Sequence, residues 1–440
     1  MSMPIPVAEC PTFIRDYADG FKDLLPGSHY QSFVASLAAS IFGISGYSDT
    51  FRYLHFSPSV SSLGNFANVD GLAARLNRRH RRRLKAILEK ARAQPSRFEF
   101  VLDDTLISHS KGSEIYGTYR WHDHSSGGYV FGHRLLVIGI VDRHHRVFIP
   151  LIWEILHRDL SSKVEEPIAN AYQKGWQVAV RLVKQLLSEG WPKLVLAADS
   201  WFAGEEFFQE LTQMDVPFVI EIKSNRIVER HGQKHVESPL DQYMHNRPRA
   251  PVYHNEKTKY GCEGVLMLRD AETSRKVVAV ANSRELDELP FAYYITNKLT
   301  WNASQIWSIS RDRWEIEVQF RELKQFFTLG EAAVRSKQSV ETTISVSVIA
   351  LTVVRLRQLS TALGDRNQNV RPIPAGAIIR DLQLETLLRC TSKLATPHQD
   401  AYRQKFQSRL NHRNLNSKPA ESRKDSKNKS HQRLEGKIPA

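Results

Sequence analysis

The sequence predicts an α/β protein in which helices flank a mixed sheet. Three observations carry this prediction. Three apolar strand patterns with short links lie between residues 97 and 156, which favours an antiparallel meander. Helix and strand patterns then alternate from residue 167 to residue 225, and the first 95 residues show only broken helical patterns.

The first strand reads RFEFVLDDT and ends at polar residues. Its alternating pattern predicts a strand that leads into Asp103 and Asp104. The elements that follow are strands at His133–Asp142 and Arg146–Leu156, a helix at Pro167–Ser188, a strand ending at Asp199, a helix at Gly204–Met214 and a strand at Pro217–Asn225. This order is found in RNase H-like domains, so we expect a mixed five-stranded sheet of that type.

The stretch 226–290 interrupts this rhythm, because it is polar, β-prone and free of Trp. We interpret it as a β-rich insertion. A strand at Tyr293–Leu299 then returns to the main sheet. Helices are expected from about residue 303 to 326, 340 to 363 and 378 to 389.

Positive charge is concentrated in two blocks. The chain carries a formal net charge of +14, which indicates a polyanionic partner. Arg75–Arg92 and Tyr402–Ala440 each count to a net +8, so the rest of the chain is nearly neutral. The first block is an amphipathic helix whose basic face suits phosphates, although a merely solvated helix is the alternative. Its candidate DNA contacts are Arg78, Arg79, Arg81, Arg82 and Arg83.

The second block is poor in apolar residues, which predicts a disordered arm. Its contact with DNA stays open. Cys10, Cys262 and Cys390 lie too far apart for a disulfide framework, a cysteine zinc site or a CxxC motif, so a reducing cytosol suits the chain. We expect no secretory signal and no membrane span, since the charge-free stretch Thr342–Val354 is too short.

Three carboxylates stand at positions that suit metal chemistry. Asp103 and Asp199 each end a strand, so neighbouring strands would bring both to one sheet edge, where oxygen ligands suit Mg²⁺. Strand-ending Asp residues also serve as turn or helix caps. Downstream, one helix face is expected to carry Ser310, Arg313, Glu317, Arg321 and Lys324. An exposed ion-paired stripe is the alternative there.

The segments FVLDDT, VLAADS and SRDRWEIEVQFRELK together resemble the DDE transposases of bacterial insertion sequences, specifically the hairpin-forming group. That group carries its third carboxylate in a Y-x2-R-x3-E-x6-K pattern. Arg313, Glu317 and Lys324 match this spacing, while Ser310 takes the place of the Tyr. The resemblance covers roughly Phe98 to Leu329.

The resemblance implies that Asp103, Asp199 and Glu317 are catalytic and bind two Mg²⁺ or Mn²⁺ ions, with Asp104 competing for the first position. The ions would serve cleavage at transposon ends and strand transfer. Arg313, Lys324 and Ser310 would contact DNA. Two ends imply a homodimer in a synaptic complex, and a bacterial element implies a nucleoid-associated cytoplasmic protein.

The resembling group also holds a flipped base on an aromatic residue of its insertion. Since no Trp lies between residues 226 and 290, Tyr253 or Tyr260 is the candidate here. Trp201 is interpreted as a core residue that could also shape the catalytic floor. His122, Asp123, His124 and His133 are interpreted as a loop cluster rather than a metal site.

These expectations divide the chain into five parts: a helical DNA-binding domain (1–95), the first part of an RNase H-like catalytic core (96–225), the β-rich insertion (226–290), the second part of the core with C-terminal helices (291–400) and a basic disordered tail (401–440). Two alternatives to a transposase remain. One is a DNA-binding regulator without catalysis, and the other is an RNase H-like nuclease that cleaves without joining.

Overall fold

The structure is a computed structural model that describes residues 7, 9–91, 94–109, 114–123, 127–157, 173–230, 237–254, 257–269, 271–286, 289–331, 333–364 and 373–394. Three predictions therefore lie outside the described residues: the basic tail 401–440, the start of the helix expected from Pro167, and the place of His124.

The N-terminal part is helical, as the broken periodicity predicts. Its elements are α1 (Thr12–Ala18), η1 (Asp19–Phe21), α2 (Ser28–Ile41), α3 (Tyr47–Tyr53), α4 (Val60–Ala67), α5 (Leu72–Lys90) and η2 (Pro95–Arg97). The Ser59 hydroxyl caps α4 by accepting the Ser62 amide. Gly71, at φ +62°, precedes α5 in a left-handed conformation that favours glycine.

Within the described residues, twelve strands form one continuous sheet. They are β1 (Phe98–Ser108), β2 (Tyr119–Asp123), β3 (Gly128–Asp142), β4 (Val147–Leu156), β5 (Leu196–Ala198), β6 (Phe218–Ile222), β7 (Ile227–Arg230), β8 (Glu237–Pro239), β9 (Ala250–His254), β10 (Lys257–Leu268), β11 (Arg275–Ala281) and β12 (Ala292–Thr296). The order is β2-β3-β1-β5-β6-β12-β11-β10-β7-β8, with β4 also on β3 and β9 also on β10. The mixed α/β class is thus confirmed.

The centre of the sheet is the predicted meander joined to two parallel strands. β3 pairs antiparallel with β1 and β4, while β5 pairs parallel with β1 and β6. The register aligns Leu102 with Ala198, where β5 ends, while β1 continues to Ser108 against β3. The sheet is larger than the five strands expected, because β12 pairs with both β6 and β11 and so joins the strands of 226–290 to the centre.

Sequence patterns missed β2, which lies in the loop rich in Gly, His and Tyr. It pairs with the first residues of β3, and the expected strand there begins five residues earlier than His133, at Gly128. These residues alternate between intermediate and exposed positions rather than forming an apolar run, so they carry little strand signal.

Helices cover both faces of the central strands. The remaining helices are α6 (Gly175–Ser188), η5 (Ser200–Phe202), α7 (Glu205–Gln213), α8 (Leu240–His245), α9 (Ala303–Asp312), α10 (Trp314–Phe326), α11 (Lys337–Gly364) and α12 (Ala375–Leu394). Alternate side chains of β1 enter two separate cores: Val101 packs with α9–α11 and the N-terminal helices, and Phe100 and Leu102 pack with α6 and α7.

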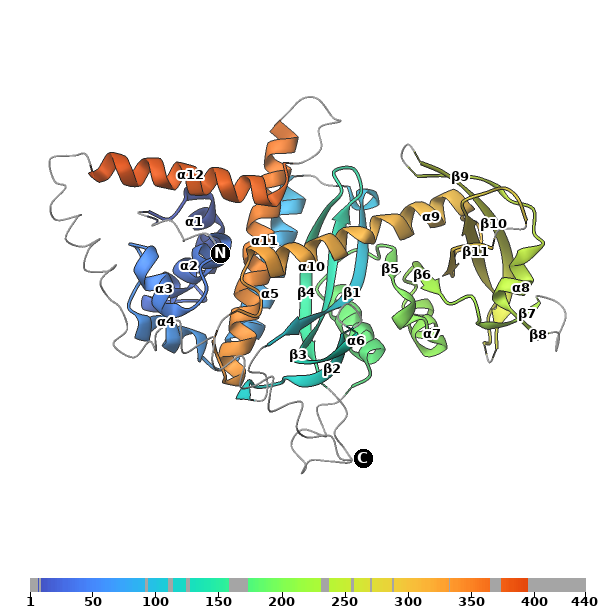
Figure 1. Ribbon diagram of the computed structural model, residues 1–440, viewed down its shortest axis with the longest axis horizontal. Helices are drawn as coiled ribbons and strands as arrows, with labels where there is room; N and C mark the ends of the chain where they lie inside the picture. The colour runs from blue at the N-terminus through green and yellow to red at the C-terminus, as the bar shows by residue number, and fades with distance from the viewer. Residues whose placement is uncertain are drawn as a thin grey trace.

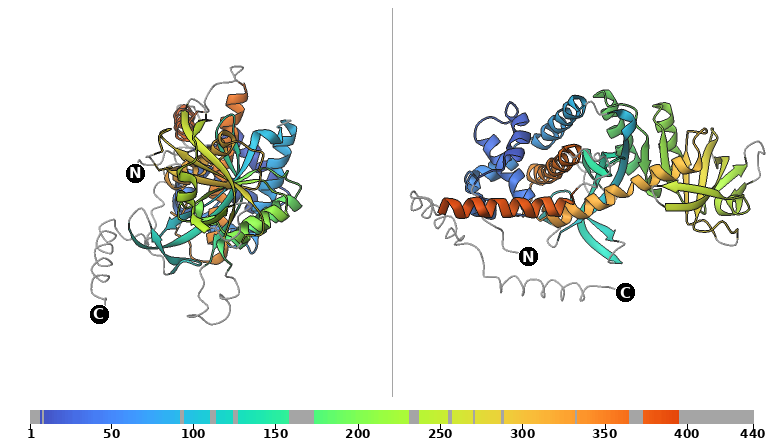
Figure 2. Two further views of the ribbon diagram at one scale, coloured as in Figure 1. Left: turned by 90° about the vertical axis from the view of Figure 1, so that its right-hand side faces the viewer. Right: turned by 90° about the horizontal axis from the view of Figure 1, so that it is seen from above.

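The molecule is elongated, with the N-terminal helices and α12 at one end, the central strands in the middle and strands β7–β11 at the other end (Figure 1). Helices α10 and α9 together run from the central strands to strands β9–β11, as the view from above also shows (Figure 2). The helix expected over residues 303–326 is thus two helices that meet at Arg313.

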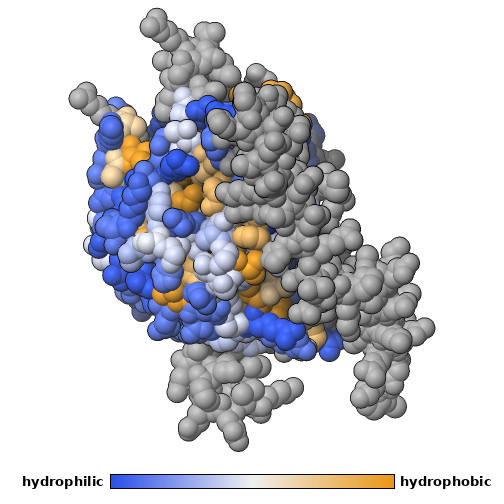
Figure 3. All heavy atoms as spheres, turned by 90° about the vertical axis from the view of Figure 1, so that its left-hand side faces the viewer, coloured by the Kyte–Doolittle hydropathy of each residue, from blue (hydrophilic) through white to orange (hydrophobic). Residues whose placement is uncertain are grey.

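The helix α11 is the one described helix long and apolar enough to cross a membrane by composition. In the apolar window within Lys337–Ser360, 83% of the residues are buried inside the protein. It therefore serves as a core helix that packs against α2, α5 and β4. The face at the N-terminal end of the molecule is mostly hydrophilic with separate hydrophobic spots where it is not covered in grey (Figure 3).

Candidate active site

Asp199 directly follows the last residue of β5, whereas Asp103 lies within β1, which continues to Ser108 and does not end at Asp103 as expected. Each follows a residue of the aligned pair Leu102 and Ala198, so the two carboxylates come together where the pairing of β1 with β5 ends. The Asp103 Oδ1 accepts the Asp104 amide at 2.8 Å, and the Asp199 Oδ1 accepts the Trp201 amide at 3.1 Å. Asp199 therefore also caps η5, which is the alternative role that its position allowed.

Asp103 and Asp104 point to opposite faces of β1, because side chains alternate along a strand. Asp103 faces α10, where its Oδ2 accepts the Arg313 Nη1 at 3.0 Å. Asp104 faces Arg134 of β3, which holds its carboxylate through Nε and Nη2. The structure thus brings Asp103, and not Asp104, to the side that carries Arg313.

Arg313 links Asp103 to Glu317. It occupies the junction of α9 and α10, and its Nη2 lies 2.8 Å from the Glu317 Oε1, one helical turn further on. The Arg313 side chain is largely buried, whereas the Glu317 side chain is 33% exposed. One guanidinium therefore bridges the first and third carboxylates of the predicted set.

Burial and mutual repulsion destabilise the charged forms of the two aspartates. Burial, together with the nearby Asp199 carboxylate, raises the pKa of Asp103 to about 8 despite the opposing effect of Arg313. Burial also raises the pKa of Asp199, again against Arg313. Burial lowers the pKa of Arg313, but Asp103 and Glu317 outweigh it and the net direction is upward.

Across the described residues, no group of three or more His, Cys, Asp or Glu side chains is arranged to hold a metal ion. The site instead offers the buried Asp103 carboxylate beside the partly buried Asp199 carboxylate, and a third carboxylate, Glu317, that is paired with Arg313. Carboxylate oxygens are the donors that Mg²⁺ and Mn²⁺ prefer, and raised pKa values mark carboxylates that a cation would stabilise. The donor chemistry of Asp103 and Asp199 therefore fits a hard divalent cation.

The remaining predicted residues of this helix face behave differently from one another. The Ser310 hydroxyl donates to the Trp307 carbonyl at 2.7 Å and also contacts the Tyr294 side chain on β12. Lys324 is exposed and close enough to Asp104 and Asp123 to feel their charges. The Tyr294 hydroxyl thus lies beside Ser310. Tyr294 is on β12, which pairs with β6.

Sequence patterns missed Arg134 and misplaced Trp201. Trp201 is 45% exposed, so its interpretation as a core residue is wrong. The Arg134 guanidinium lies 4.3 Å from the centroid of the Trp201 ring and 5.5 Å from that of Trp121. A lone Arg in the otherwise apolar strand HRLLVIGIVD was the available signal, because a charge there needs a partner.

The basic helix α5 uses several of its predicted DNA contacts within the protein. Arg81 is 2% exposed and makes two 2.6 Å contacts with the Glu189 carboxylate, so it cannot reach DNA and is corrected to a structural residue. Arg79 pairs with Asp23, and Arg83 donates to the Asp16 carbonyl and lies over the Tyr17 ring. Arg78 and Arg82 are exposed.

The histidine cluster is also divided. His133 is buried and bonds to His109 at 2.8 Å and to the Tyr116 carbonyl at 2.7 Å. The His122 ring packs against Tyr129 on the exposed hairpin. These contacts are local packing, but the prediction of a loop is wrong for the described members of the cluster, because His122 and Asp123 lie on β2 and His133 lies on β3.

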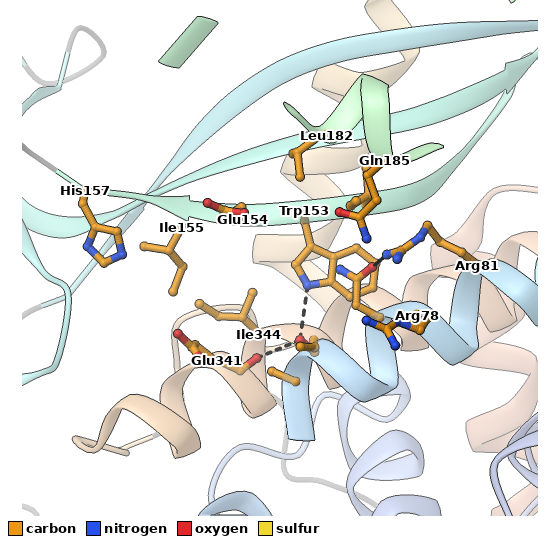
Figure 4. Close-up of a pocket in the computed structure, with 15 residues that line it drawn as sticks. Arg78, Arg81, Trp153, Glu154, Ile155, His157, Leu182, Gln185, Glu341 and Ile344 are labelled. Atoms are coloured by element: carbon orange, nitrogen blue, oxygen red, sulfur yellow. Dashed lines mark hydrogen bonds between the residues drawn. The ribbon is translucent and has the colours of Figure 1, made fainter. Parts of the chain in front are cut away.

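A cavity of about 300 Å³ lies away from the carboxylates, between α5, β4, α6 and α11. In it Trp153 donates to Ser345, and Arg78 faces Glu154 and Glu341 from across the cavity (Figure 4). A groove of about 830 Å³ begins at Ser200, next to Asp199, and runs between α7 and β10. Its basic lining residues are Lys223, Arg226 and Arg269.

Comparison with known proteins found a similar solved structure and a matching sequence family. A solved structure described as "Cryo-EM structure of piggyBac transposase synaptic complex with hairpin DNA" is similar at a TM-score of 0.44 and 10% identity, covering 93% of this chain and 84% of that chain. A score this low does not establish a shared fold. No curated protein sequence matches the chain. Residues 62–278, a segment just short of half of the chain that includes Asp103 and Asp199, match the family described as "DDE superfamily endonuclease".

Proposed function

We propose that the protein is a DNA transposase that uses divalent metal ions to cleave transposon ends and to join them to target DNA. The observation that carries the proposal is the placement of Asp103 and Asp199 next to the last aligned pair of the parallel strands β1 and β5, with Glu317 joined to Asp103 through Arg313. The match of residues 62–278 to DDE superfamily endonucleases also supports it. The matched segment contains Asp103 and Asp199 and ends before Glu317.

The central strand order supports an RNase H-like core. β4, β3 and β1 form the antiparallel part, and β5 and β6 add parallel strands beyond β1. In this arrangement the first two carboxylates lie on neighbouring parallel strands, while the third comes from a helix that packs on β1. We assign the insertion to 226–290, which extends the same sheet.

Asp103, Asp199 and Glu317 would hold two Mg²⁺ or Mn²⁺ ions, and we assign the first position to Asp103 because Asp104 is held by Arg134 on the other face. When bound, such ions activate the attacking oxygen and stabilise the leaving oxygen of an in-line phosphodiester displacement. Glu317 becomes available when its ion pair with Arg313 opens. The released guanidinium can then bind a phosphate in bidentate fashion.

DNA is the proposed partner, and exposed basic side chains at three places on the protein are its proposed contacts. Arg78 and Arg82 are exposed on α5, Lys324 is exposed beside the carboxylate edge, and Lys223 is exposed in the groove next to Ser200. Exposed cations of this kind neutralise phosphates without reading sequence. A homodimer would hold two DNA ends, and origin in a bacterial insertion sequence of the hairpin-forming group would make the protein nucleoid-associated.

The test uses purified full-length protein with Mg²⁺, the DNA ends that flank its own gene, and a supercoiled plasmid target. Joined products that disappear in Glu317→Ala are expected. Cleavage without joining would instead identify a nuclease. DNA binding without cleavage would favour a regulator in which Arg313 holds Asp103 and Glu317 as a structural ion pair.

A further inference from the structure

The hairpin formed by β2 and the start of β3 projects beyond the rest of the sheet. β2 pairs with residues 128–132 of β3, whereas the pairing of β1 with β3 ends at Ser108 and Gly132. Among the described strands, residues 128–131 of β3 therefore pair with β2 alone. Both views in Figure 2 show this two-stranded ribbon standing out from the body of the molecule.

The inner face of the hairpin is anchored to the central strands. The Trp121 Nε1 donates to the Gly132 carbonyl at 3.1 Å, and the Arg134 guanidinium lies 5.5 Å from the centroid of the Trp121 ring. The Tyr119 hydroxyl shares a hydrogen bond of 3.1 Å with the His157 Nδ1. These contacts hold the ribbon in one orientation relative to the core.

The outer face of the hairpin carries four exposed side chains that meet across the two strands. Arg120 stands opposite Phe131, and His122 stands opposite Tyr129. The Arg120 guanidinium lies 5.1 Å from the centroid of the Tyr129 ring, and the His122 ring packs against it at 5.3 Å. Tyr129 is 60% exposed and Phe131 is 43% exposed. Exposed aromatic side chains gathered at adjacent positions of a projecting ribbon indicate a binding surface.

This outer face continues the sheet face that carries Asp103. Asp103 pairs with Val137 in the register of β1 and β3, and directly paired residues share a face. Alternate residues of a strand also share a face, so steps of two along β3 lead from Val137 to Phe131 and Tyr129. Six residues at about 3.3 Å each place Phe131 roughly 20 Å from Val137 along the strand. That length corresponds to about six base pairs of DNA at about 3.4 Å each.

The charges around the outer face complement a polyanion. Among its described residues this face has the Arg120 guanidinium and no carboxylate, since Asp123 belongs to the inner face with Trp121. Asp123 is also close enough to Lys324 of α10 to feel its charge. The hairpin therefore lies beside an exposed lysine that the proposed function already assigns to DNA.

The shape of the hairpin fits duplex DNA, because the major groove is about 12 Å wide and admits a two-stranded β-ribbon. A single strand is instead bound in a channel of the protein, which a projecting ribbon does not form. Resting on the proposed function, we propose that the outer face of the hairpin lies in a groove of the duplex DNA end, about six base pairs from the cut. Arg120 contacts a backbone phosphate, and Tyr129 and Phe131 contact sugars and base edges.

The first test measures the affinity of full-length protein for the DNA end that flanks its gene, at several salt concentrations, with Ca²⁺ in place of Mg²⁺ to keep the DNA uncut. Arg120→Gln should weaken binding about fivefold at about 0.15 M salt, because one phosphate contact is lost. The slope of log Kd against log salt concentration should fall by about 1.

Arg389→Gln is the matched control. The Arg389 side chain is 58% exposed and ion-paired with Glu385 on α12, at the end of the molecule formed by the N-terminal helices (Figure 1). This variant should match wild type in affinity and in salt slope. Thermal melting of both variants checks that the fold is kept.

Photocrosslinking provides the second readout. Tyr129→p-benzoylphenylalanine should crosslink to the duplex within about one helical turn, roughly 10 base pairs, of the cut. The control is Leu388→p-benzoylphenylalanine, because Leu388 is 61% exposed on α12. It should give no crosslink to the DNA end.

Unchanged affinity and salt slope in Arg120→Gln would overturn the hairpin contact, and so would the absence of a DNA crosslink from position 129. Cleavage by the wild-type protein would leave the proposed function intact in both cases. A crosslink from position 129 to a second protein chain in place of DNA would make the outer face a subunit interface and overturn the contact as well. A crosslink to a DNA end that wild-type protein never cuts in Mg²⁺ would keep the hairpin contact and overturn the proposed function.

Discussion

Glu99 and Asp103 lie four residues apart on the same face of β1, and both are buried acids whose pKa burial raises to about 8. Glu99 faces Arg143 at 2.7 Å, and Arg143 also reaches Asp312, the last residue of α9. Asp103 faces Arg313, the next residue along. The two acids therefore meet neighbouring positions of one helix junction.

The difference lies in what surrounds each acid. Glu99 is the second residue of β1, where it pairs with Arg143 of the β3–β4 turn. Asp103 stands where the pairing of β1 with β5 ends, beside a second carboxylate, Asp199, and close to the groove that starts at Ser200. A raised pKa marks both residues, so position at the sheet edge is what distinguishes a candidate site from a structural ion pair.

The largest expected effect separates the two acids by activity. Asp103→Asn or Asp199→Asn should slow cleavage of the DNA end by about a thousandfold or more, because each removes a proposed metal ligand. Glu99→Gln should stay within about threefold of wild type. Single-turnover cleavage assays measure this, with DNA affinity as the control for folding. Equal losses in Glu99→Gln and Asp103→Asn would erase the distinction.

Metal binding should sharpen the same contrast. Asp199→Asn is expected to weaken Mn²⁺ binding by at least about tenfold, since it removes one of two adjacent anionic oxygen ligands. Glu99→Gln should bind Mn²⁺ as wild type does. Titration calorimetry without DNA makes the comparison, and undiminished binding in Asp199→Asn would place the metal elsewhere.

The sequence predicts the part of this contrast that depends on strand order and helical spacing, which is the position of Asp103, but not the burial of Glu99. The meander and the following parallel strands placed Asp103 and Asp199 at one edge, and i, i+4 spacing placed Arg313 beside Glu317. Glu99 gave no signal, because a polar residue in an alternating strand is expected to face water, whereas this one is fully buried and paired with Arg143.

Other misses have the same cause. The partner of Arg81 is Glu189, 108 residues away, so helical periodicity on α5 suggested a free basic face. The exposure of Trp201 depends on Gly175 and Arg134, which reach it only through tertiary packing. The continuity of the insertion with the main sheet depends on β12 pairing with β11, a contact that no local pattern encodes.

A smaller effect tests the structural acid by stability. Arg143→Ala should lower the free energy of unfolding by about 1–3 kcal/mol, because it leaves Glu99 and Asp312 buried without their shared cation. Urea denaturation measures the loss. Adding Glu99→Gln to Arg143→Ala should recover part of it, and a double variant no more stable than Arg143→Ala would argue against the pairing.

The smallest effect is a pH dependence. The folded pKa of Glu99, about 8, lies above its ordinary value of 4.5, so the folded chain retains a proton that the unfolded chain releases between these values. Stability from this group is full below pH 4.5 and is lost as pH rises toward 8. The fall in unfolding free energy from pH 5 to pH 8 should be smaller in Glu99→Gln than in wild type, because glutamine has no proton to release. Identical pH profiles for the two proteins would contradict a buried protonated Glu99.

The pairing of β12 with both β6 and β11 constrains how this protein can be dissected. All five residues of β12 are buried, and its antiparallel partner β11 is buried throughout as well. A shortened version lacking residues 226–290 would leave the Ala292–Thr296 strand as a bare apolar edge with unpaired amides and carbonyls. Such edges recruit strands from other chains, so the shortened protein is expected to aggregate rather than to yield a minimal catalytic unit.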